Sequence, residues 1–263
     1  MPSLPEYLRP LLTRQPYPHP VGAVQLIETH VSWLFLTGEY AYKIKRPVRY
    51  PFIDLRSPGR RAFLCEEELR LNRRFAPELY LEVCRITVQD GLTQIGGEGS
   101  IVEYAVRMHQ FEGREELDQL LAAGRVEPGE LEEFGRDVSR RLATLPVARS
   151  PQGWGRPDLV RKLLQENIAQ CMQCFASLGT QGEMHALSDP LKAMLLALDP
   201  VIESRREQGR VRECHGDLHC RNVVRYQGRL LAFDCMEFEP AFRWIDVAEE
   251  VAFLLMDLHV QHA

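Results

Sequence analysis

The 263-residue chain lacks an uninterrupted apolar run of the roughly 18–20 residues that a membrane-spanning helix needs. Its most apolar stretch, residues 247–256, is broken by Glu249 and Glu250. The first six residues also lack the basic start and apolar core of a secretory signal. We therefore expect a protein that works in the cytoplasm, without contact to a membrane.

A basic excess is absent as well. The chain carries 32 Lys and Arg residues against 37 Asp and Glu residues, a formal net charge of −5, so the sequence does not predict a nucleic-acid partner. Seven cysteines are an odd number, and without an export signal we interpret them as reduced thiols rather than as a disulfide framework. Hydrophobic residues at 45% and charged residues at 26% are typical of a globular protein and exclude a mainly disordered or fibrous chain.

The first part of the chain is rich in β-strand patterns. Residues 1–22 are rich in proline and predict an irregular arm with one short turn. Beyond the arm, alternating apolar residues predict an antiparallel meander, and a helix is expected at 60–75. Leu64, Leu71 and Phe75 fall on one face of that helix. The strands are expected at 24–27, 33–36, 40–45, 83–88 and 101–108, the last two joined across a glycine-rich turn at 91–99.

The remainder of the chain is mainly helical. Gly and Pro residues separate helical patterns that we expect at 115–123, 128–144, 158–178, 190–209 and 244–260. Two short strand-like runs, 223–226 and 229–233, flank a turn at Gln227 and Gly228. The order of elements predicts an α+β protein made of the arm 1–22, a small β-rich unit 23–108 and a larger helical unit 109–263.

The stretch 214–222 carries the residues best suited to chemistry. Its Asp217 is followed five residues later by Asn222, and Asp234 ends a short hairpin twelve residues further on. Phosphoryl transfer needs one group that orients and deprotonates the acceptor hydroxyl, and oxygen ligands that hold Mg²⁺ against the nucleotide phosphates. Asp217 suits the first role, and Asn222 with Asp234 suits the second.

A family resemblance rests on the run His-Gly-Asp-Leu-His-x-x-Asn at 215–222 and on Phe-Asp at 233–234. These runs resemble the catalytic and metal loops of the aminoglycoside phosphotransferase and choline kinase superfamily. The closer resemblance is to bacterial aminoglycoside phosphotransferase-like proteins, often fused to a C-terminal P-loop ATPase half, and it extends to 42–47, 65–72, 76–80 and 243–246. It implies a two-lobed protein-kinase-like fold, with a small antiparallel β-sheet lobe at 23–108 and a larger helical lobe at 109–263. It also implies ATP and Mg²⁺ as cofactors.

The resemblance places the contact with the ATP phosphates in the small lobe. Lys43 matches the family's third-strand lysine, which lies over the α- and β-phosphates and is held by a helix glutamate. Glu66, Glu67 and Glu68 compete for that role. Glu68 lies about 40° from the centre of the helix's apolar face, and Glu67 roughly 60° away on the other side. Glu68 is therefore the expected partner, with Glu67 as the alternative.

Further roles follow from the resemblance. The glycine-rich loop of protein kinases is missing, because residues 29–32 contain no glycine, and backbone amides with the Ser32 hydroxyl are expected to contact phosphate instead. Met108, where the last strand of the small lobe passes into the helical lobe, is expected near the adenine ring. Asp246 is expected to brace the catalytic loop, and Glu237 matches a position near the metal.

Neighbouring residues have plainer interpretations. His215 and His219 are expected to brace the loop around Asp217 rather than to act as bases. Lys45 and Arg46 are expected at the surface. Several arginines are expected on solvated faces rather than in a phosphate-binding patch: Arg60, Arg61, Arg70, Arg73, Arg74, Arg205, Arg206, Arg210 and Arg212.

A zinc site is the alternative from another class of chemistry. Cys171 and Cys174, with the Cys-His pair at 214–215 or the His-Cys pair at 219–220, would supply soft ligands. Because Cys171 and Cys174 fall within a helical pattern, we favour reduced cysteines in a core or a groove.

The sequence therefore predicts a phosphotransferase that moves the γ-phosphate of ATP, with Mg²⁺, to a hydroxyl group of a small molecule. The alternative is a nucleotide-binding regulatory module with little or no turnover, acting with a P-loop ATPase partner. The helix at 244–260 is apolar on most of its circumference, so we expect other parts of the protein to pack against it on several sides. That pattern indicates a missing C-terminal segment or a partner. No motif identifies the acceptor.

Overall fold

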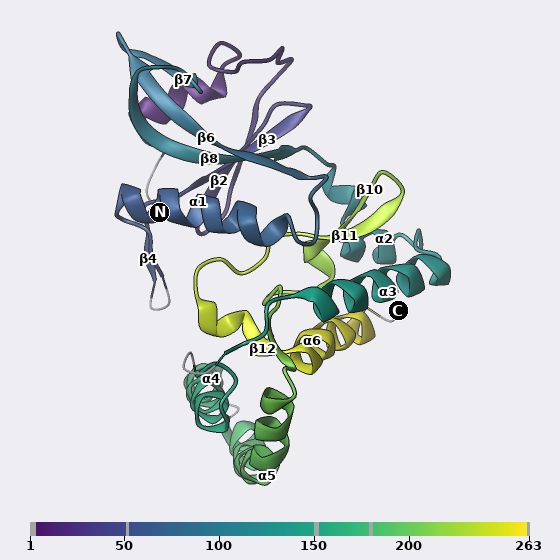
Figure 1. Cartoon of the computed structure of the whole chain (residues 1–263). Coiled ribbons are helices and arrows are strands. Elements are labelled where there is room, and N and C mark those ends of the chain that lie inside the picture. The colour runs from purple at the N-terminus through teal and green to yellow at the C-terminus, as the bar shows by residue number, and fades with distance from the viewer. Residues whose placement is uncertain (1–3, 51–52, 150–152, 179–180, 262–263) are drawn as a thin grey trace.

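The structure, a computed structural model, describes residues 4–50, 53–149, 153–178 and 181–261. Over these residues the chain is an α+β protein, with a curled antiparallel sheet in its first part and mostly helices in its second part (Figure 1). The expected α+β class is thereby confirmed.

The sheet has six strands in the order β1-β2-β3-β8-β6-β7, and all neighbours run antiparallel. Its strands are β1 Gln25–Glu28, β2 Ser32–Leu36, β3 Tyr40–Lys45, β6 Tyr80–Gln89, β7 Leu92–Ile95 and β8 Ser100–His109. A separate hairpin pairs β4 Arg49–Tyr50 with β5 Ile53–Asp54. The predicted meander of the first three strands is confirmed.

Strand β7 lies inside the stretch that the sequence predicted to be a turn. Gly91 and Gly96 adopt positive φ angles of 77° and 79°, which glycine reaches without a steric penalty. They close two tight turns and leave four residues between them that pair with β6. A run of glycines thus marked two turns around a short strand rather than one long turn.

The N-terminal arm is packed against the sheet. It contains a 3₁₀ helix, Glu6–Leu12, whose Leu8 and Leu11 are fully buried. These two side chains share a hydrophobic cluster with Trp33 and Phe35 of β2. The arm therefore contributes to the core of the β-rich part.

Helix α1, Pro58–Asn72, lies between the sheet and the helical part (Figure 1). Its buried side chains belong to three hydrophobic clusters: Leu64 packs with the β4–β5 hairpin, Leu69 with β8, and Leu71 with Phe75 in the core of the helical part. The helix is thereby fixed on three sides, which determines where its polar side chains point.

Helices and short strands make up the rest. The helices are α2 Leu117–Ala122, α3 Pro128–Thr144, α4 Pro157–Leu178, α5 Gln181–Glu207 and α6 Val247–Val260, with 3₁₀ turns at Gly113–Glu115, Cys220–Asn222 and Pro240–Phe242. Strand β9 Val211–Glu213 pairs with β12 Trp244–Asp246, and β10 Val223–Tyr226 pairs with β11 Arg229–Ala232.

The largest differences from the predicted helix boundaries concern three helices. Helix α1 ends at Asn72 rather than at 75, so Phe75 lies beyond it. Helix α5 begins at Gln181 rather than at 190, so Pro190 and Pro200 both lie within it. The last helix begins only after β12, because Asp246 caps it by accepting a hydrogen bond from the N–H of Ala248.

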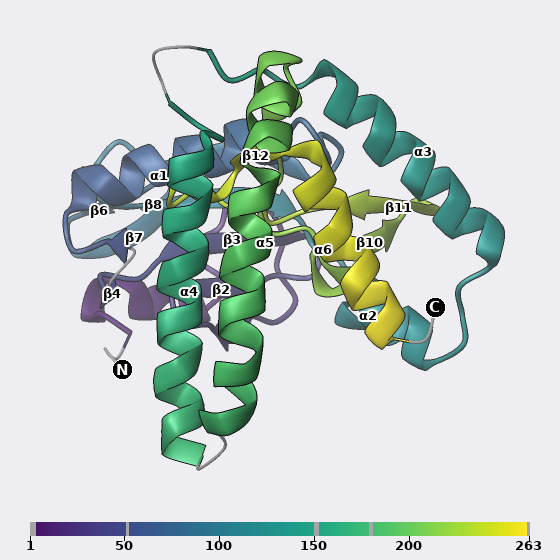
Figure 2. The same ribbon diagram turned by 90° about the horizontal axis from the view of Figure 1, so that it is seen from below.

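Helix α6 is covered on one side within the described residues. Leu254 and Glu250 are buried, whereas an apolar face formed by Phe253, Leu255, Met256 and Val260 is exposed. Helices α4 and α5 pack against each other as an antiparallel pair (Figure 2). The expectation that α6 is covered on several sides is not met by the described part of the chain.

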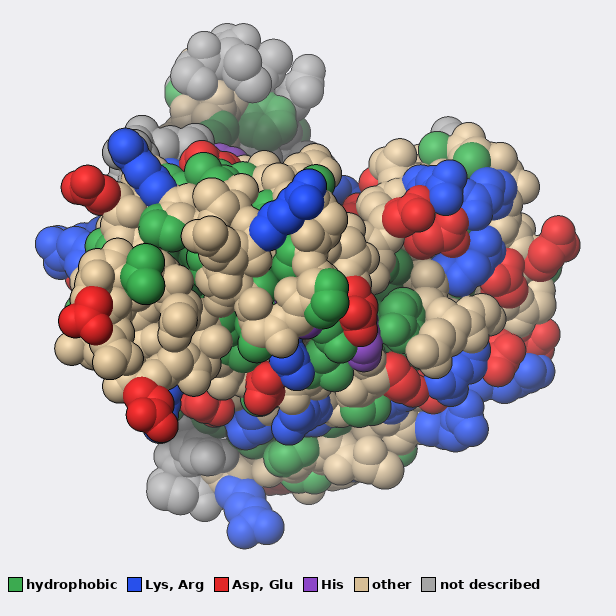
Figure 3. Space-filling model, turned by 90° about the horizontal axis from the view of Figure 1, so that it is seen from above, with side chains coloured by type: hydrophobic (Ala, Val, Ile, Leu, Met, Phe, Trp, Pro, Cys, Tyr) green, Lys and Arg blue, Asp and Glu red, His purple; other side chains and the backbone are tan. Residues whose placement is uncertain are grey.

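The described helices include none that is both long enough and apolar enough to cross a membrane. On the face seen in Figure 3, positive and negative side chains are interspersed rather than separated into patches of one sign.

Candidate functional site

The loop between β9 and β10 carries Asp217 and is held by helix α6. The main-chain N–H groups of His215 and Gly216 donate to the two carboxylate oxygens of Glu250, each at 3.0 Å. Gly216 adopts a φ of +83°, and a Cβ atom there would lie 2.8 Å from the carbonyl oxygen of Phe242. Both the backbone conformation and this close approach therefore require glycine.

Asp217 is the carboxylate of this loop that reaches solvent, with 37% of its side chain exposed. The amide nitrogen of Asn222 donates to its main-chain oxygen at 2.9 Å and to its Oδ2 at 3.1 Å. Burial acts to raise the pKa of Asp217, but contacts with His219 and Asn222 outweigh it and hold this pKa below its usual value. The carboxyl group is therefore ionised at neutral pH and able to accept a proton.

Both histidines of the loop bind its own backbone. His215 is fully buried; its Nδ1 accepts from the N–H of Asp217 at 3.3 Å, and its Nε2 lies 2.8 Å from the carbonyl oxygen of Phe233. His219 Nδ1 accepts from the N–H of Arg221 at 3.2 Å, while its Nε2 lies 3.7 Å from Asp217 Oδ2. The two rings thus orient the loop, as the sequence predicted.

A second group of charges lies where β3, α1 and the segment after β11 meet. Lys43 Nζ lies 2.5 Å from Asp234 Oδ1 and 2.8 Å from Glu68 Oε1. Burial acts to lower the pKa of Lys43, but Asp234 and Glu68 raise it well above its usual value, so the amine is charged. The fold thus brings together three residues that the sequence assigned to nucleotide and metal binding.

Asp234 is the most exposed member of this group. Its side chain is 40% exposed and its φ is +63°. The N–H of Asp234 donates to the Tyr80 hydroxyl at 3.2 Å, and the N–H of Cys235 donates to Asn72 Oδ1 at 2.9 Å. A left-handed backbone at a residue other than glycine costs energy and persists where neighbouring contacts hold it, as is common at functional sites. Burial acts to raise the pKa of Asp234, but Lys43, together with Lys45 and His215, outweighs it and lowers this pKa below its usual value, so this carboxyl group is ionised.

The prediction that Lys45 and Arg46 lie at the surface is wrong. Their exposed fractions are 1% and 0%. Lys45 Nζ donates to Glu68 Oε2 at 2.7 Å and to Glu237 Oε1. Arg46 donates to the carbonyl oxygen of Thr29 at 2.5 Å. Strand alternation assigns a residue to one face of a sheet but does not say what covers that face.

The glutamates of α1 have different partners. Glu68 contacts both lysines of β3, and it is fully buried. Glu67 contacts Arg70 and Arg243 instead. The structure therefore places Glu68 rather than Glu67 beside Lys43.

Ser32 and Met108 both lie within the sheet, with exposed fractions of 0% and 4%. Ser32 is opposite Lys45 in the register of β2 and β3, and its hydroxyl has no hydrogen-bond partner among the described residues. Because the side chain is enclosed, a phosphate contact through this hydroxyl has no support. Met108 lies one residue before the end of β8 and packs with Leu79 and Leu231.

Asp246 does not brace the loop that carries Asp217, contrary to the sequence prediction. Its carboxylate binds Arg205 at 2.6 and 2.7 Å. Glu250, about one turn further along α6, has the bracing role, and burial raises its pKa to about 7 although the loop's N–H donors oppose that rise. Only the position of α6 against the loop reveals this, because a glutamate in a helical pattern is usually expected to face solvent.

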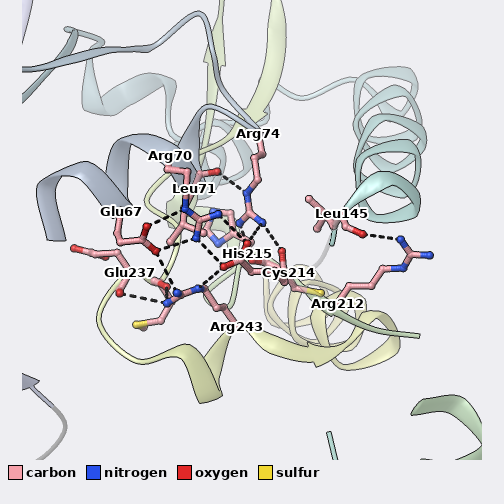
Figure 4. A network of polar contacts seen from close by, with 12 residues as sticks. Glu67, Arg70, Leu71, Arg74, Leu145, Arg212, Cys214, His215, Glu237 and Arg243 are labelled. Carbon is pink, nitrogen blue, oxygen red and sulfur yellow. Dashed lines mark hydrogen bonds and ion pairs between the residues drawn. The ribbon is translucent and has the colours of Figure 1, made fainter. Parts of the chain in front are cut away.

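The arginines predicted on a solvated face near the end of α1 divide into two groups: Arg70 and Arg73 are exposed as predicted, whereas Arg74 is largely enclosed. Arg70, Arg74 and Arg243 form an arginine cluster around one buried carboxylate. Glu213, 4% exposed, accepts from Arg70 at 2.7 and 2.9 Å, from Arg74 at 3.2 Å and from Arg243 at 3.1 Å. Arg74 also donates to the carbonyl oxygen of Cys214 at 3.1 Å (Figure 4). This arginine cluster joins α1 to the start of the loop that carries Asp217.

No group of three or more His, Cys, Asp and Glu side chains lies close enough to hold a metal ion within the described ranges. Cys171 and Cys174 are exposed on α4, so the core or groove position expected for them is wrong. Cys214 and Cys220 are buried. The zinc alternative therefore gains no support.

Comparison with known proteins gives distant relatives. No family model matches this chain. Curated relatives include the uncharacterized proteins Mb2027c of Mycobacterium bovis and MT2060 and Rv2004c of Mycobacterium tuberculosis. Each is 25% identical over 243 residues, which cover 91% of this chain and 47% of the relative. The chain thus spans about half the length of the curated relatives it matches, and their names assign no activity.

Proposed function

We propose that this protein is a small-molecule kinase with a two-lobed protein-kinase-like fold, related to the aminoglycoside phosphotransferase-like proteins. It transfers the γ-phosphate of ATP, with Mg²⁺, to a hydroxyl group. The observation that carries the proposal is the contact of Lys43 with Glu68 and Asp234, residues from three separate segments. A buried charged lysine beside a partly exposed carboxylate is suited to neutralising nucleotide phosphates.

Asp217 is the proposed catalytic residue. Its carboxylate is ionised and is held by Asn222, so it can orient an acceptor hydroxyl and accept its proton. The attacking oxygen then bonds to the γ-phosphorus while the bond to the β-phosphate oxygen breaks, and ADP leaves.

Oxygen ligands for Mg²⁺ are available from two residues. The side-chain amide nitrogen of Asn222 donates to Asp217, so its amide oxygen is left to bind the ion. The carboxylate of Asp234 is partly exposed and ionised. Magnesium prefers such oxygen donors and keeps several waters, so a protein contribution of two side chains fits it. When bound, the ion neutralises charge that develops on the phosphates.

Substitution of Asp217 tests the proposed function. Asp217→Ala should abolish phosphate transfer from labelled ATP to a panel of hydroxyl compounds, because it removes the carboxylate proposed to accept the proton. The thermal shift caused by Mg²⁺ and ATP should persist, since Lys43, Asn222 and Asp234 are untouched. Asp189→Ala, at an 88% exposed side chain, is the control and should retain transfer. Full turnover in Asp217→Ala would overturn the assignment.

The second candidate is a nucleotide-binding regulatory module that acts with a P-loop ATPase partner. The observation that favours it is the length of the curated relatives, about twice that of this chain. This candidate predicts a thermal shift with Mg²⁺ and ATP but no transfer to any compound of the panel. Transfer by the isolated chain would exclude it.

A further inference from the structure

Strand β3 directs two lysines to one carboxylate. Lys43 and Lys45 are two residues apart and therefore lie on the same face of the strand. Lys43 Nζ lies 2.8 Å from Glu68 Oε1, and Lys45 Nζ lies 2.7 Å from Glu68 Oε2. Lys45 also contacts Glu237 Oε1. The result is an alternating row of charges in the order Asp234, Lys43, Glu68, Lys45, Glu237.

The two ends of this charge row differ in their access to solvent. The side chains of Lys45, Glu68 and Glu237 are 0%, 0% and 2% exposed. Those of Lys43 and Asp234 are 10% and 40% exposed. A ligand can therefore reach only the end formed by Lys43 and Asp234, while the end formed by Lys45 and Glu237 is enclosed.

Lys45 rather than Lys43 holds Glu68 by an aligned hydrogen bond. The hydrogen bond of Lys43 goes to Asp234 Oδ1, and its contact with Glu68 Oε1 is an ion pair in which that oxygen has no aligned donor. The hydrogen bond to Glu68 Oε2 comes from Lys45. Lys43 can thus exchange Asp234 for a phosphate oxygen without releasing the carboxylate behind it.

Glu237 is itself fixed to the helical part. Arg243 donates to the main-chain oxygens of Met236 and Glu237, each at 3.3 Å, and Figure 4 shows Arg243 beside Glu237. The ring centroid of Phe238 lies 5.1 Å from Lys45 Nζ. The contact between Lys45 and Glu237 therefore links the sheet to the segment that follows Asp234.

We propose that Lys45 and Glu237 are positioning residues that hold Glu68 in place, so that Glu68 presents Lys43 to the nucleotide phosphates. Neither of them touches the nucleotide. This inference rests on the proposed function and extends it to two residues for which the sequence analysis expected a surface position and a place near the metal.

The test compares Lys45→Met with the double variant Lys45→Met/Glu237→Leu. The single variant leaves Glu68 and Glu237 as buried carboxylates without Lys45, so its melting temperature should fall. The double variant also removes the Glu237 carboxylate, so that only Glu68 lacks Lys45, and it should recover part of that loss. In both variants the KM for Mg²⁺-ATP should rise about tenfold or more, because Lys43 is no longer held in its binding geometry.

A matched control comes from another buried ion pair, which joins α1 to the sheet. Arg61 of α1 binds Glu103 of β8 at 2.6 and 2.9 Å, with side chains 4% and 1% exposed, so Arg61 is not on the solvated face predicted for it. Arg61→Met/Glu103→Gln should lower the melting temperature and leave the KM for Mg²⁺-ATP within about twofold of wild type.

The outcomes separate positioning from a purely structural role. A double variant that recovers both melting temperature and nucleotide KM would overturn the inference, and so would a control that raises KM as much as Lys45→Met does. A wild-type chain with neither a thermal shift nor turnover on Mg²⁺ and ATP would instead overturn the proposed function and this inference with it. A wild-type shift with equal shifts in all variants would overturn this inference alone.

Discussion

His215 is buried in its neutral form because both ring nitrogens are already used. Nε2 lies against the carbonyl oxygen of Phe233 and must carry the proton, whereas Nδ1 accepts from the N–H of Asp217. A second proton would sit on Nδ1 and face that N–H. Burial lowers the pKa of His215 to about 4, although the Phe233 carbonyl and nearby carboxylates oppose the shift.

The pH dependence of stability follows from this pKa. The unfolded chain binds a proton at His215 near pH 6.5 and the folded chain only near pH 4, so the contribution is complete above pH 6.5 and is lost as the pH falls towards 4. The loss amounts to at most about 3 kcal/mol. His215→Gln should lack this component, which urea denaturation of both proteins between pH 8 and pH 4 measures. Parallel pH profiles for wild type and variant would contradict the prediction.

Single side chains also show that strand periodicity is insufficient to predict which residues are buried. Alternation places Lys43 and Lys45 on one face of β3, and it leaves undecided whether solvent or protein covers that face. The helical wheel favours Glu68 over Glu67 because Glu68 is nearer the apolar face, and the structure places Glu68 between the lysines. A carboxylate near the apolar edge of a helix was thus a usable signal for a buried partner.

At the scale of elements, the loop that carries Asp217 depends on one glycine. Gly216 and Gly228 have similar φ angles, +83° and +77°, but a Cβ at Gly216 would lie 2.8 Å from the carbonyl oxygen of Phe242, whereas nothing lies within 4 Å of one at Gly228. Substitutions at these two glycines therefore distinguish the cost of a left-handed backbone, which both share, from the cost of steric overlap, which arises only at Gly216.

Alanine at these two glycines should give different losses of stability. Gly228→Ala should cost roughly 1–2 kcal/mol, the strain of a left-handed backbone at a residue with a side chain. Gly216→Ala should cost clearly more, because segment 242–243 must also move, and it should lower phosphate transfer through Asp217. Urea denaturation measures the stability difference, and equal losses would show that the close approach has no energetic effect.

The sequence predicted helix α1 as an element, but it did not predict which parts of the protein this helix packs against. Leu64, Leu71 and Phe75 define an apolar face in the sequence, and all three are buried. They belong to two different clusters, and Leu69 to a third, which no single helical wheel distinguishes. That three-sided packing holds Glu68 at the level of the β3 lysines.

At the scale of the whole molecule, the arginine cluster joins the β-rich and helical parts. Glu213 of β9 receives hydrogen bonds from Arg70 of α1, from Arg74 just beyond the end of α1, and from Arg243. Burial raises the pKa of Glu213, but the arginines outweigh it and lower this pKa below its usual value. Its contribution to stability is therefore present above about pH 4.5 and is lost as the pH falls through the lower folded-state value.

Loss of this carboxylate should weaken the connection between the two parts. Glu213→Gln leaves Arg74 without its carboxylate partner and leaves Glu67 as the carboxylate that contacts Arg70 and Arg243. It should cost about 3 kcal/mol in urea denaturation at neutral pH. Glu132→Gln removes an exposed i,i+4 partner of Arg136 and should cost less than about 0.5 kcal/mol. A similarly small loss of unfolding free energy in both variants would show that the arginine cluster contributes little to the connection between the β-rich and helical parts.

The sequence by itself determined the α+β class, most strand and helix positions, and the short motif around Asp217 and Asn222. These features depend on local periodicity and on residues close together in the chain, which a sequence displays directly. It also gave Lys43, Glu68 and Asp234 as a candidate set, although their contact is a property of the folded chain alone.

Only the tertiary structure decided which side chains are buried together. In the folded chain, Lys45 is buried against Glu237, and Glu250 rather than Asp246 holds the loop that carries Asp217. Arginines that were expected in solvent bind Glu213. The physical reason is that the cost of burying a charge depends on partners supplied by distant segments, whereas periodicity reports only the face on which a residue lies.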